Sequence, residues 1–369
     1  MARGVDARYV ERVHRRSPRA RRVGAALAAA VLAMSLAAFT QPRDDAGRFT
    51  NLDGSLPRGL GTALKWGVWD RITGKRRESP DRAPVPTVAP DLARLRTPPA
   101  PGAPARITWL GHATFLVQLD GVSLLTDPAL EPKLFGGIER NVPPGVAIAD
   151  LPRIDAVLVS HAHYDHLDLP TVQKVGAPAI AGLGLERWFR DRRVFATELG
   201  WWSSARVGPV KITFVPAQHW SRRGLFDTNR TLWGGFVIEG TRATIYHSGD
   251  TAWFAGFDEI GRRFPGIDAA LLPIGAYDPA WFMETMHLNP EQALRAFRAL
   301  GARTFVAMHW GTFKLADEPL DEPPRRLEAE RVRLGIPAER VRVLAVGETL
   351  DVARAAGAAR DVDLAPAAP

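Results

Sequence analysis

Apolar and polar residues follow two different spacings along most of this chain. Short runs that are apolar or alternate with period two indicate strands, and they fall at 106–110, 115–119, 122–126, 155–160, 210–215, 233–239, 243–247, 269–273, 304–308 and 341–344. Apolar positions three and four residues apart indicate helices near 169–175, 183–190, 254–263, 290–300 and 323–334. Asp120-Gly121, between two of the strands, is typical of a hairpin turn. This order predicts a mixed α and β domain.

A further helical pattern lies upstream, at 60–72, and two interpretations of it are open. The first is a helix that docks on the protein core. The second is an amphipathic helix at a lipid surface, with tryptophans at the interface and cations near the headgroups. The apolar residues of 49–72 could also serve a homodimer. The stripe consists of Leu60, Leu64, Val68 and Ile72, beside Trp66 and Trp69, and the cations are Lys65, Arg71, Lys75, Arg76 and Arg77.

The segments around these patterns suggest a division of the chain. Residues 41–57 have an irregular pattern and predict a tether. Eight prolines within 80–104 predict a stiff, extended connection without a helix. We therefore predict an N-terminal extension over 41–104, the main domain over 105–355 and a flexible, Ala-rich tail over 356–369.

The positive charge of the chain is concentrated in its first 40 residues. The formal net charge is +8, but residues 1–40 hold eight arginines against Asp6 and Glu11, which leaves +2 for the remainder. The main domain shows no basic stripe interleaved with aromatics, so we expect no nucleic-acid partner. The arginines precede 17 uncharged, mostly apolar residues at 23–39, the layout of a secretory signal or a short membrane anchor. This leader predicts a membrane-associated or exported protein, and a cytoplasmic one if the leader is not functional.

The clearest chemistry lies at 161–166, where His-Ala-His-Tyr-Asp-His directly follows a strand-like run. A strand that ends in a tight turn of ligands can aim two side chains at one metal ion and two at its neighbour. Imidazole nitrogen with carboxylate oxygen suits zinc, and also iron or manganese. The chain has no cysteine, so a disulfide or a thiolate ligand is excluded. A single histidine would more often belong to a polar loop, but four ligand-type residues in this order favour a metal site.

Three more donors follow strand-like runs at separate positions: His219, Asp250 and His309. Together with His161, His163, Asp165 and His166 they make seven donors. Seven is too many for one tetrahedral zinc ion. It is the right number for two ions that share a bridging carboxylate and a bridging water.

These motifs are similar to those of a known superfamily. The chain resembles the metallo-β-lactamase superfamily, whose signature is an HxHxDH loop followed by a distant His, Asp and His. Within it, the chain is most similar to the N-acyl-phosphatidylethanolamine-hydrolysing phospholipase D family and its bacterial relatives, from about residue 49 to about residue 350. The segments that carry the resemblance are Trp109-Leu110-Gly111-His112-Ala113-Thr114, Leu125-Thr126-Asp127-Pro128, Gln218-His219-Trp220, Leu232-Trp233-Gly234-Gly235, Pro273-Ile274-Gly275-Ala276-Tyr277, Trp281-Phe282-Met283 and Met308-His309-Trp310-Gly311-Thr312-Phe313.

The resemblance implies a fold and a metal centre. The fold is an α/β (α+β) sandwich of four layers, αββα, with two sheets between helices. The centre holds two zinc ions, with manganese or iron as alternatives. The implied ligands are His161, His163 and His219 for one ion, Asp165, His166 and His309 for the other, and Asp250 as the bridge between them.

The resemblance also suggests which other residues surround the reaction. His287 matches a residue near the substrate phosphate, and we count it with Asp165 and Asp250 as catalytic. Its surroundings fit a helix-flanking histidine as well, because the run at 289–292 looks like a capping box. Among the aromatic residues of the motif-bearing loops, Trp220 and Tyr277 are expected to contact the substrate. His112 and Asp127 are expected to orient ligands, and His247 is left outside the ligand set.

The expected reaction is hydrolysis of a phosphodiester in a phospholipid, by direct attack of a metal-bridging hydroxide. The sequence has no HxK motif of the kind used by phospholipases D that form a phospho-histidine. A lactone, a small phosphodiester or another ester is the alternative substrate, because fold does not fix function. A non-catalytic binding protein is a third hypothesis, which the intact ligand set disfavours.

Overall fold

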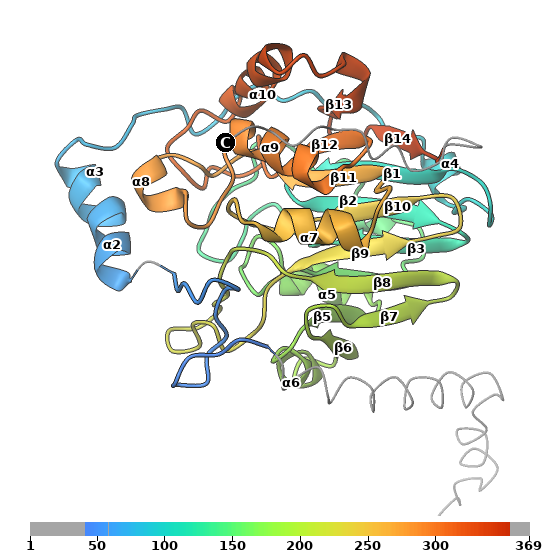
Figure 1. The fold of residues 1–369 in the computed structure, drawn as a ribbon, viewed down its shortest axis with the longest axis horizontal. Coiled ribbons are helices and arrows are strands. Elements are labelled where there is room, and N and C mark those ends of the chain that lie inside the picture. The colour runs from blue at the N-terminus through green and yellow to red at the C-terminus, as the bar shows by residue number, and fades with distance from the viewer. Residues whose placement is uncertain (1–40, 58, 355–369) are drawn as a thin grey trace, which may run out of the picture.

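Two seven-stranded sheets pack face to face, with helices on the outer faces (Figure 1). The computed structural model describes residues 41–57 and 59–354. The predicted leader at 1–40 and the predicted tail at 356–369 lie outside the described residues. The αββα architecture expected from the sequence is confirmed.

Each sheet is built mainly from one half of the chain. The order in the first sheet is β14-β1-β2-β3-β4-β5-β6, and in the second it is β13-β12-β11-β10-β9-β8-β7. The first sheet contains β1 (Ala105–Gly111), β2 (Thr114–Leu119), β3 (Val122–Thr126), β4 (Ala156–Val159), β5 (Ala179–Gly182), β6 (Ala196–Leu199) and β14 (Thr349–Val352). The second contains β7 (Ser204–Val207), β8 (Val210–Val215), β9 (Gly235–Glu239), β10 (Thr244–His247), β11 (Ala269–Pro273), β12 (Thr304–Met308) and β13 (Val341–Arg342).

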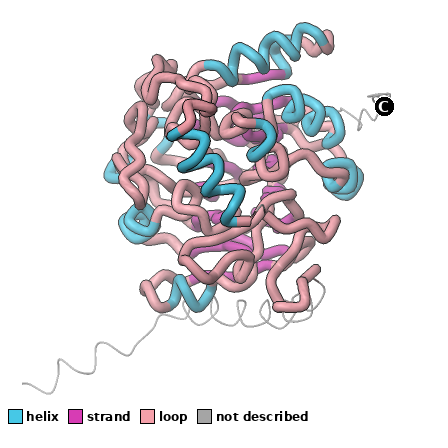
Figure 2. Tube along the Cα trace, turned by 90° about the vertical axis from the view of Figure 1, so that its left-hand side faces the viewer, coloured by secondary structure: helices cyan, strands magenta, loops and turns pink. Residues whose placement is uncertain are grey.

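Helices cover both sheets and one further side of the sandwich (Figures 1 and 2). The main helices are α5 (Leu169–Val175), α6 (Glu186–Arg190), α7 (Gly256–Arg263), α9 (Pro290–Leu300) and α10 (Glu322–Arg333), with shorter turns at α8 (Ala280–Met283), Ile148–Asp150 and Ala338–Arg340. The predicted capping box is confirmed at the start of α9, where the Asn289 side chain accepts from the Gln292 backbone and the Gln292 side chain accepts from the Asn289 backbone.

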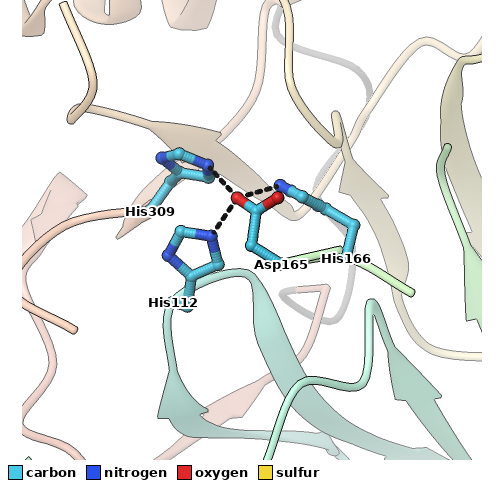
Figure 3. Close-up of side chains that lie close together, drawn as sticks. All are labelled: His112, Asp165, His166 and His309. Carbon is cyan, nitrogen blue, oxygen red and sulfur yellow. Dashed lines mark hydrogen bonds and ion pairs between the residues drawn. The ribbon is translucent and has the colours of Figure 1, made fainter. Parts of the chain in front are cut away.

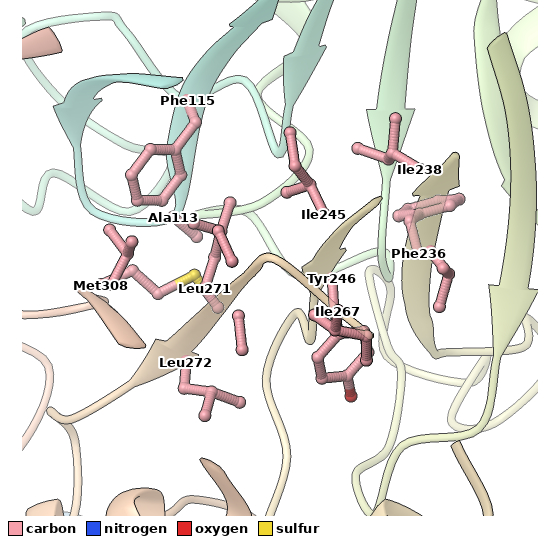
Figure 4. Packing of buried hydrophobic residues seen from close by; sticks show 14 of the residues in the cluster. Ala113, Phe115, Phe236, Ile238, Ile245, Tyr246, Ile267, Leu271, Leu272 and Met308 are labelled. Atoms are coloured by element: carbon pink, nitrogen blue, oxygen red, sulfur yellow. The ribbon is translucent and has the colours of Figure 1, made fainter. Parts of the chain in front are cut away.

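The period of two along the strands divides the apolar residues between two cores. On β2, Phe115 and Val117 point into the layer between the sheets, whereas Leu116 joins the layer beneath α5 and α6. Figure 4 shows Phe115 facing Leu271 and Met308 of the opposite sheet. Burial of each such side chain contributes about 1.5–3 kcal/mol to the free energy of folding. The packed sheets form a rigid support for the loops at their ends.

Four strands were not predicted from the sequence: β5, β6, β7 and β14. β5 is the run Ala-Ile-Ala-Gly, which is fully buried but too short and too small to show a period. β7 lies at the edge of its sheet, with a polar and half-exposed sequence. A four-residue helix, α4 (Leu92–Leu95), also corrects the expectation that 80–104 has no helix. Asp91 caps it by accepting from the Arg94 backbone, and Leu95 is buried.

The upstream helix is present at 60–72 as α2 (Leu60–Leu64), a π-helical turn (Lys65–Trp69) and α3 (Asp70–Ile72). It docks through Trp66, which stacks on Phe282 with ring centroids 5.1 Å apart and donates to Asp317. Four apolar side chains of the segment point to solvent instead: Leu64 is 61% exposed, Val68 50%, Trp69 59% and Ile72 76%. The helix thus docks on the protein as the first interpretation predicts, but through Trp66, while these four side chains stay exposed.

Residues 41–57, which we call the N-terminal strap, are irregular as predicted but lie packed on the sandwich. Phe49 is 1% exposed and belongs to the core between the sheets. Its backbone N–H donates to the Asn229 carbonyl at 2.9 Å. The interpretation as a tether is thus corrected, because core contacts fix the strap. Over the described part of the chain, no helix combines the length and apolarity needed to cross a membrane.

Candidate metal centre

The seven predicted donors meet at one edge of the sandwich, where strands of both sheets end. The loop after β4 supplies four of them, at 161–166. His219 follows β8, Asp250 follows β10 and His309 follows β12. In each sheet these strands run in the same direction, β4 parallel to β3 and β12 parallel to β11 and β10, so their carboxyl ends lie at one side.

Three imidazoles form the first group of donors. His161 Nε2 lies 2.8 Å from His163 Nδ1, and His219 Nε2 lies 3.3 Å from the same nitrogen. Ligands at about 2.0–2.1 Å from a tetrahedral zinc ion are about 3.3 Å apart. Both distances from His163 Nδ1 are therefore close to the spacing that one ion requires. All three also lie within 4.8 Å of one another.

The second group surrounds Asp165, whose carboxylate points to three imidazoles (Figure 3). Its Oδ2 lies 2.9 Å from His112 Nε2, 3.4 Å from His166 Nε2 and 3.5 Å from His309 Nε2. His112 was expected only to orient a ligand, and it does contact Asp165. It also lies close enough to be counted as a fourth donor.

Asp250 lies between the two groups. Its Oδ2 is 3.1 Å from His166 Nε2, 4.0 Å from His161 Nε2 and 3.9 Å from His219 Nε2, and its Oδ1 is 3.1 Å from His309 Nε2. One carboxylate thus faces donors of both groups. This is the placement required of a ligand shared by two ions.

Several buried polar atoms at this edge have no hydrogen-bond partner among the described residues. An unpaired polar atom in the interior costs about 1–3 kcal/mol, so their concentration here fits a centre that metal ions complete. The atoms that face the donor groups are His166 Nε2, His287 Nδ1, His309 Nε2 and Asp250 Oδ1. The 3.1 Å approaches of His166 and His309 to Asp250 are not aligned as hydrogen bonds.

Burial and neighbouring charge shift the imidazole pKa values in opposite directions on the two sides of the metal-free centre. Burial lowers the pKa of His163 to about 4 and holds the pKa values of His161 and His219 well below their usual value. Neutral imidazole is the form that binds metal. Burial acts in the same direction on His166 and His309, but neighbouring carboxylates outweigh it. They raise the pKa of His166 well above its usual value and that of His309 to about 9.

A second layer of contacts fixes the rings. Asp127 is completely buried and accepts from the Ser160 backbone at 2.7 Å, while its Oδ2 lies 2.8 Å from His166 Nδ1 and 2.9 Å from His247 Nε2. The contact at Nδ1 leaves His166 Nε2 directed at the centre. His247 faces this carboxylate and lies outside the donor groups, as the sequence suggested.

The backbone at the centre adopts sparsely populated conformations. His112, Asp127 and His309 have φ values of 54°, 36° and 60°. Such conformations cost about 1–3 kcal/mol each and persist where the surrounding structure determines them. Gly275 permits the close approach at His309, since a Cβ there would lie 2.1 Å from the His309 carbonyl oxygen.

Comparison with known proteins identifies the family. Residues 123–310 match the family described as "Beta-lactamase superfamily domain". The chain belongs to this superfamily. A solved metallo hydrolase from the archaeon Ignicoccus hospitalis has 25% identity and a TM-score of 0.52, with 67% of this chain and 97% of that chain covered. The protein is a metal-dependent hydrolase of the metallo-β-lactamase superfamily.

Two protein relatives extend the similarity. An uncharacterized protein of Mycobacterium tuberculosis is 37% identical over 344 residues, which covers 86% of this chain and 88% of the relative. N-acyl-phosphatidylethanolamine-hydrolyzing phospholipase D 1 of Caenorhabditis elegans is 37% identical over 247 residues, which covers 60% of this chain and 69% of the relative.

The three further residues predicted for this metallo-hydrolase lie in different surroundings. His287 borders the centre, with Nδ1 3.8 Å from Asp250 Oδ2. Trp220 packs on His163, with ring centroids 4.5 Å apart. Tyr277 is buried, its hydroxyl donates to Glu322 at 2.7 Å and Arg326 lies over its ring. Tyr277 does not belong to the donor groups, and its contact with substrate stays a prediction.

Some residues that shape the centre gave no signal in the sequence. The Met286 carbonyl accepts from His219 Nδ1 at 2.9 Å, and the Asn51 side chain accepts from the His219 backbone at 3.1 Å. A main-chain carbonyl carries no residue-type signal. Asn51 lies 168 positions from its partner, so only the folded chain brings the two together.

Proposed function

We propose that this metallo-hydrolase binds two zinc ions and cleaves a phosphodiester bond in N-acyl-phosphatidylethanolamine-like lipids. The observation that carries the proposal is the position of Asp250 between two donor groups. His161, His163 and His219 would hold one ion, and Asp165, His166 and His309 the other. When bound, the two ions supply an acidified water at neutral pH and neutralise phosphate charge.

The residues of the chain would perform the remaining steps. Asp250 faces both ion sites and would fix their separation. Asp165 and Asp127 both contact His166, and Asp165 also contacts His309. His287 borders the centre through its partnerless Nδ1 and is 13% exposed on its side chain. It would contact a phosphate oxygen, because burial lowers its pKa to about 4 and leaves one neutral N–H to donate.

A pocket beside the centre supports a substrate with an apolar chain. It has a volume of about 330 Å³ and lies between the N-terminal strap and the His219 loop. A pocket of this size falls in the range that binds small molecules. Its apolar lining residues are Leu56, Pro57, Trp220, Phe282 and Met286. The phospholipase D relative from Caenorhabditis elegans supports the same substrate class.

The direct test is turnover of N-acyl-phosphatidylethanolamine in vesicles, with zinc measured on the same sample. We expect two zinc ions per chain and release of phosphatidic acid. Because no covalent enzyme intermediate is proposed, added ethanol or butanol should yield little phosphatidyl alcohol. Abundant phosphatidyl alcohol would refute direct attack. Two zinc ions without lipid turnover would favour the lactone or small-ester substrates.

The exposed stripe of the 60–72 helix supports a membrane surface as the partner. Val68 and Ile72 point to solvent beside the exposed cations Arg71 and Lys75. Apolar residues flanked by cations are typical of helices that lie in an anionic lipid interface.

We expect the Val68→Glu/Ile72→Glu double variant to bind anionic vesicles at least fivefold more weakly and to raise KM on vesicles. Turnover of a short-chain, water-soluble phosphodiester should not change. Val332→Glu is the matched control, because Val332 is 60% exposed on α10, outside this helix. If vesicle binding is unchanged while the double variant shifts a dimer to a monomer in sedimentation, the stripe serves a second copy of the chain.

A further inference from the structure

The N-terminal strap holds the loop that carries His219. The key residue is Asn51, which is 3% exposed. Its side-chain oxygen accepts from the His219 backbone N–H at 3.1 Å and from Trp233 Nε1 at 3.0 Å. Its side-chain nitrogen donates to Ser55 Oγ at 3.2 Å within the strap. One amide thus joins the strap to a strand-end tryptophan and to a predicted metal ligand.

A second contact joins the same two segments. Gln218 Nε2 donates to Asp53 Oδ2 at 3.0 Å and to Ser55 Oγ at 2.9 Å. Two consecutive residues of the loop are therefore bound to the strap. The strap is itself fixed by Phe49, whose carbonyl accepts from Asn229 Nδ2 at 3.1 Å.

These contacts determine where the His219 ring lies. Asn51 fixes the backbone of His219, and the Met286 carbonyl accepts from Nδ1 at 2.9 Å. With Nδ1 as the donor, Nε2 carries the lone pair that points to His163. The two contacts act on different parts of the residue, so loss of either would leave the ring free to tilt away from its partners.

We propose that Asn51 is a positioning residue for the metal ion held by His161, His163 and His219. The strap precedes the stretch at 123–310 that matches the superfamily, so a segment from outside that stretch supports a ligand of one ion site. This inference rests on the proposed assignment of His219 as a metal ligand. It does not depend on the identity of the substrate.

The test is the zinc affinity of each of the two equivalents, measured by competition with a chromophoric chelator on the full chain. We expect Asn51→Ala to weaken one equivalent by about 10–100-fold, as for other residues that support a ligand, and to leave the other within twofold. Asn51→Asp keeps the acceptor oxygen and should restore the affinity. Asp44→Ala is the control, because that carboxylate bonds Arg48 and Ala46 within the strap.

The proposal is overturned if folded Asn51→Ala keeps both affinities, or if both equivalents weaken by the same factor. If Asn51→Ala does not fold, the Asp53→Ala variant tests the proposal instead, because Asp53 is exposed. Asp53→Ala removes one contact of Gln218 and the acceptor of the Ser55 backbone N–H. A twofold to threefold weakening of the same equivalent is expected, whereas unchanged affinity contradicts the proposal. Because zinc binding is the readout, a failure of lipid turnover would not be confused with a failure of this inference.

Discussion

The Asp250→Ala variant is expected to lose at least one of its two metal ions and at least about 10³-fold in hydrolytic rate, which corresponds to about 4 kcal/mol. The carboxylate lies 3.1 Å from His166 Nε2 and 3.1 Å from His309 Nε2, and it also faces the group that contains His161. Without it, the two ions lose their shared ligand and the positive charges that they bring lose their nearest counter-charge. Metal content and turnover on the same preparation measure both effects.

Asp268→Ala is the matched control. Asp268 is an equally buried carboxylate that lies away from the centre, where it accepts from the Thr244 backbone at 2.9 Å. This variant should lose stability but keep two ions per chain. If Asp250→Ala retains two ions with parental affinity, the assignment of Asp250 as the shared ligand is wrong.

The Asp127→Ala variant is expected to lower the free energy of unfolding of the metal-free protein by about 3–5 kcal/mol, the usual cost of removing one partner from a buried charged pair. Burial alone would lower the pKa of His166. The charges of Asp250, Asp165 and Asp127 together raise it by more than burial lowers it. Asp127 also accepts from Ser160 Oγ at 2.8 Å. Its loss removes the carboxylate at His166 Nδ1 and one of the two partners of the Ser160 hydroxyl, which otherwise contacts only His161 Nδ1. Urea unfolding measures the change.

Zinc affinity gives the second readout for Asp127. We expect a loss of about 10–100-fold for the ion held by His166, because the ring loses the contact that orients it. Asp155→Ala is the control, since this carboxylate accepts from the Ser123 backbone in the same sheet, is partly exposed and bonds no predicted ligand. A change in unfolding free energy no greater than that of Asp155→Ala would contradict the role given to Asp127.

The sequence predicted those parts of the site whose signals are local. The loop at 161–166 contains four ligand-type residues within six positions. Each distant donor directly follows an apolar run that predicts a strand. Nothing local links Asn51 to His219 or His247 to Asp127. The first pair forms when the strap packs on the His219 loop, and the second forms when the two sheets pack together. Residue type at one position cannot reveal a contact of that kind.

Among the helices and strands too, those with a local sequence signal were predicted and those that depend on long-range contacts were not. Strands with a clear apolar run were found, but β5 and β14 depend on neighbours that stabilise short or half-exposed segments. The helix at 60–72 was found from its stripe, yet its docked face could not be predicted. The stacking of Trp66 on Phe282 decides that face, and this contact joins segments far apart in the chain.

The return of β14 to the first sheet has a consequence for biosynthesis. β14 pairs with β1, and Thr108 and Thr349 join their hydroxyls at 2.8 Å across a separation of 241 residues. His309 also belongs to the late part of the chain. During translation, β1 therefore lacks its neighbour β14, and the donor set lacks His309, until these late residues have been synthesised. Contacts of such long range form slowly and expose partly folded chains to aggregation. Stable capture of both metal ions is thus expected only after the segment from His309 to β14 has left the ribosome.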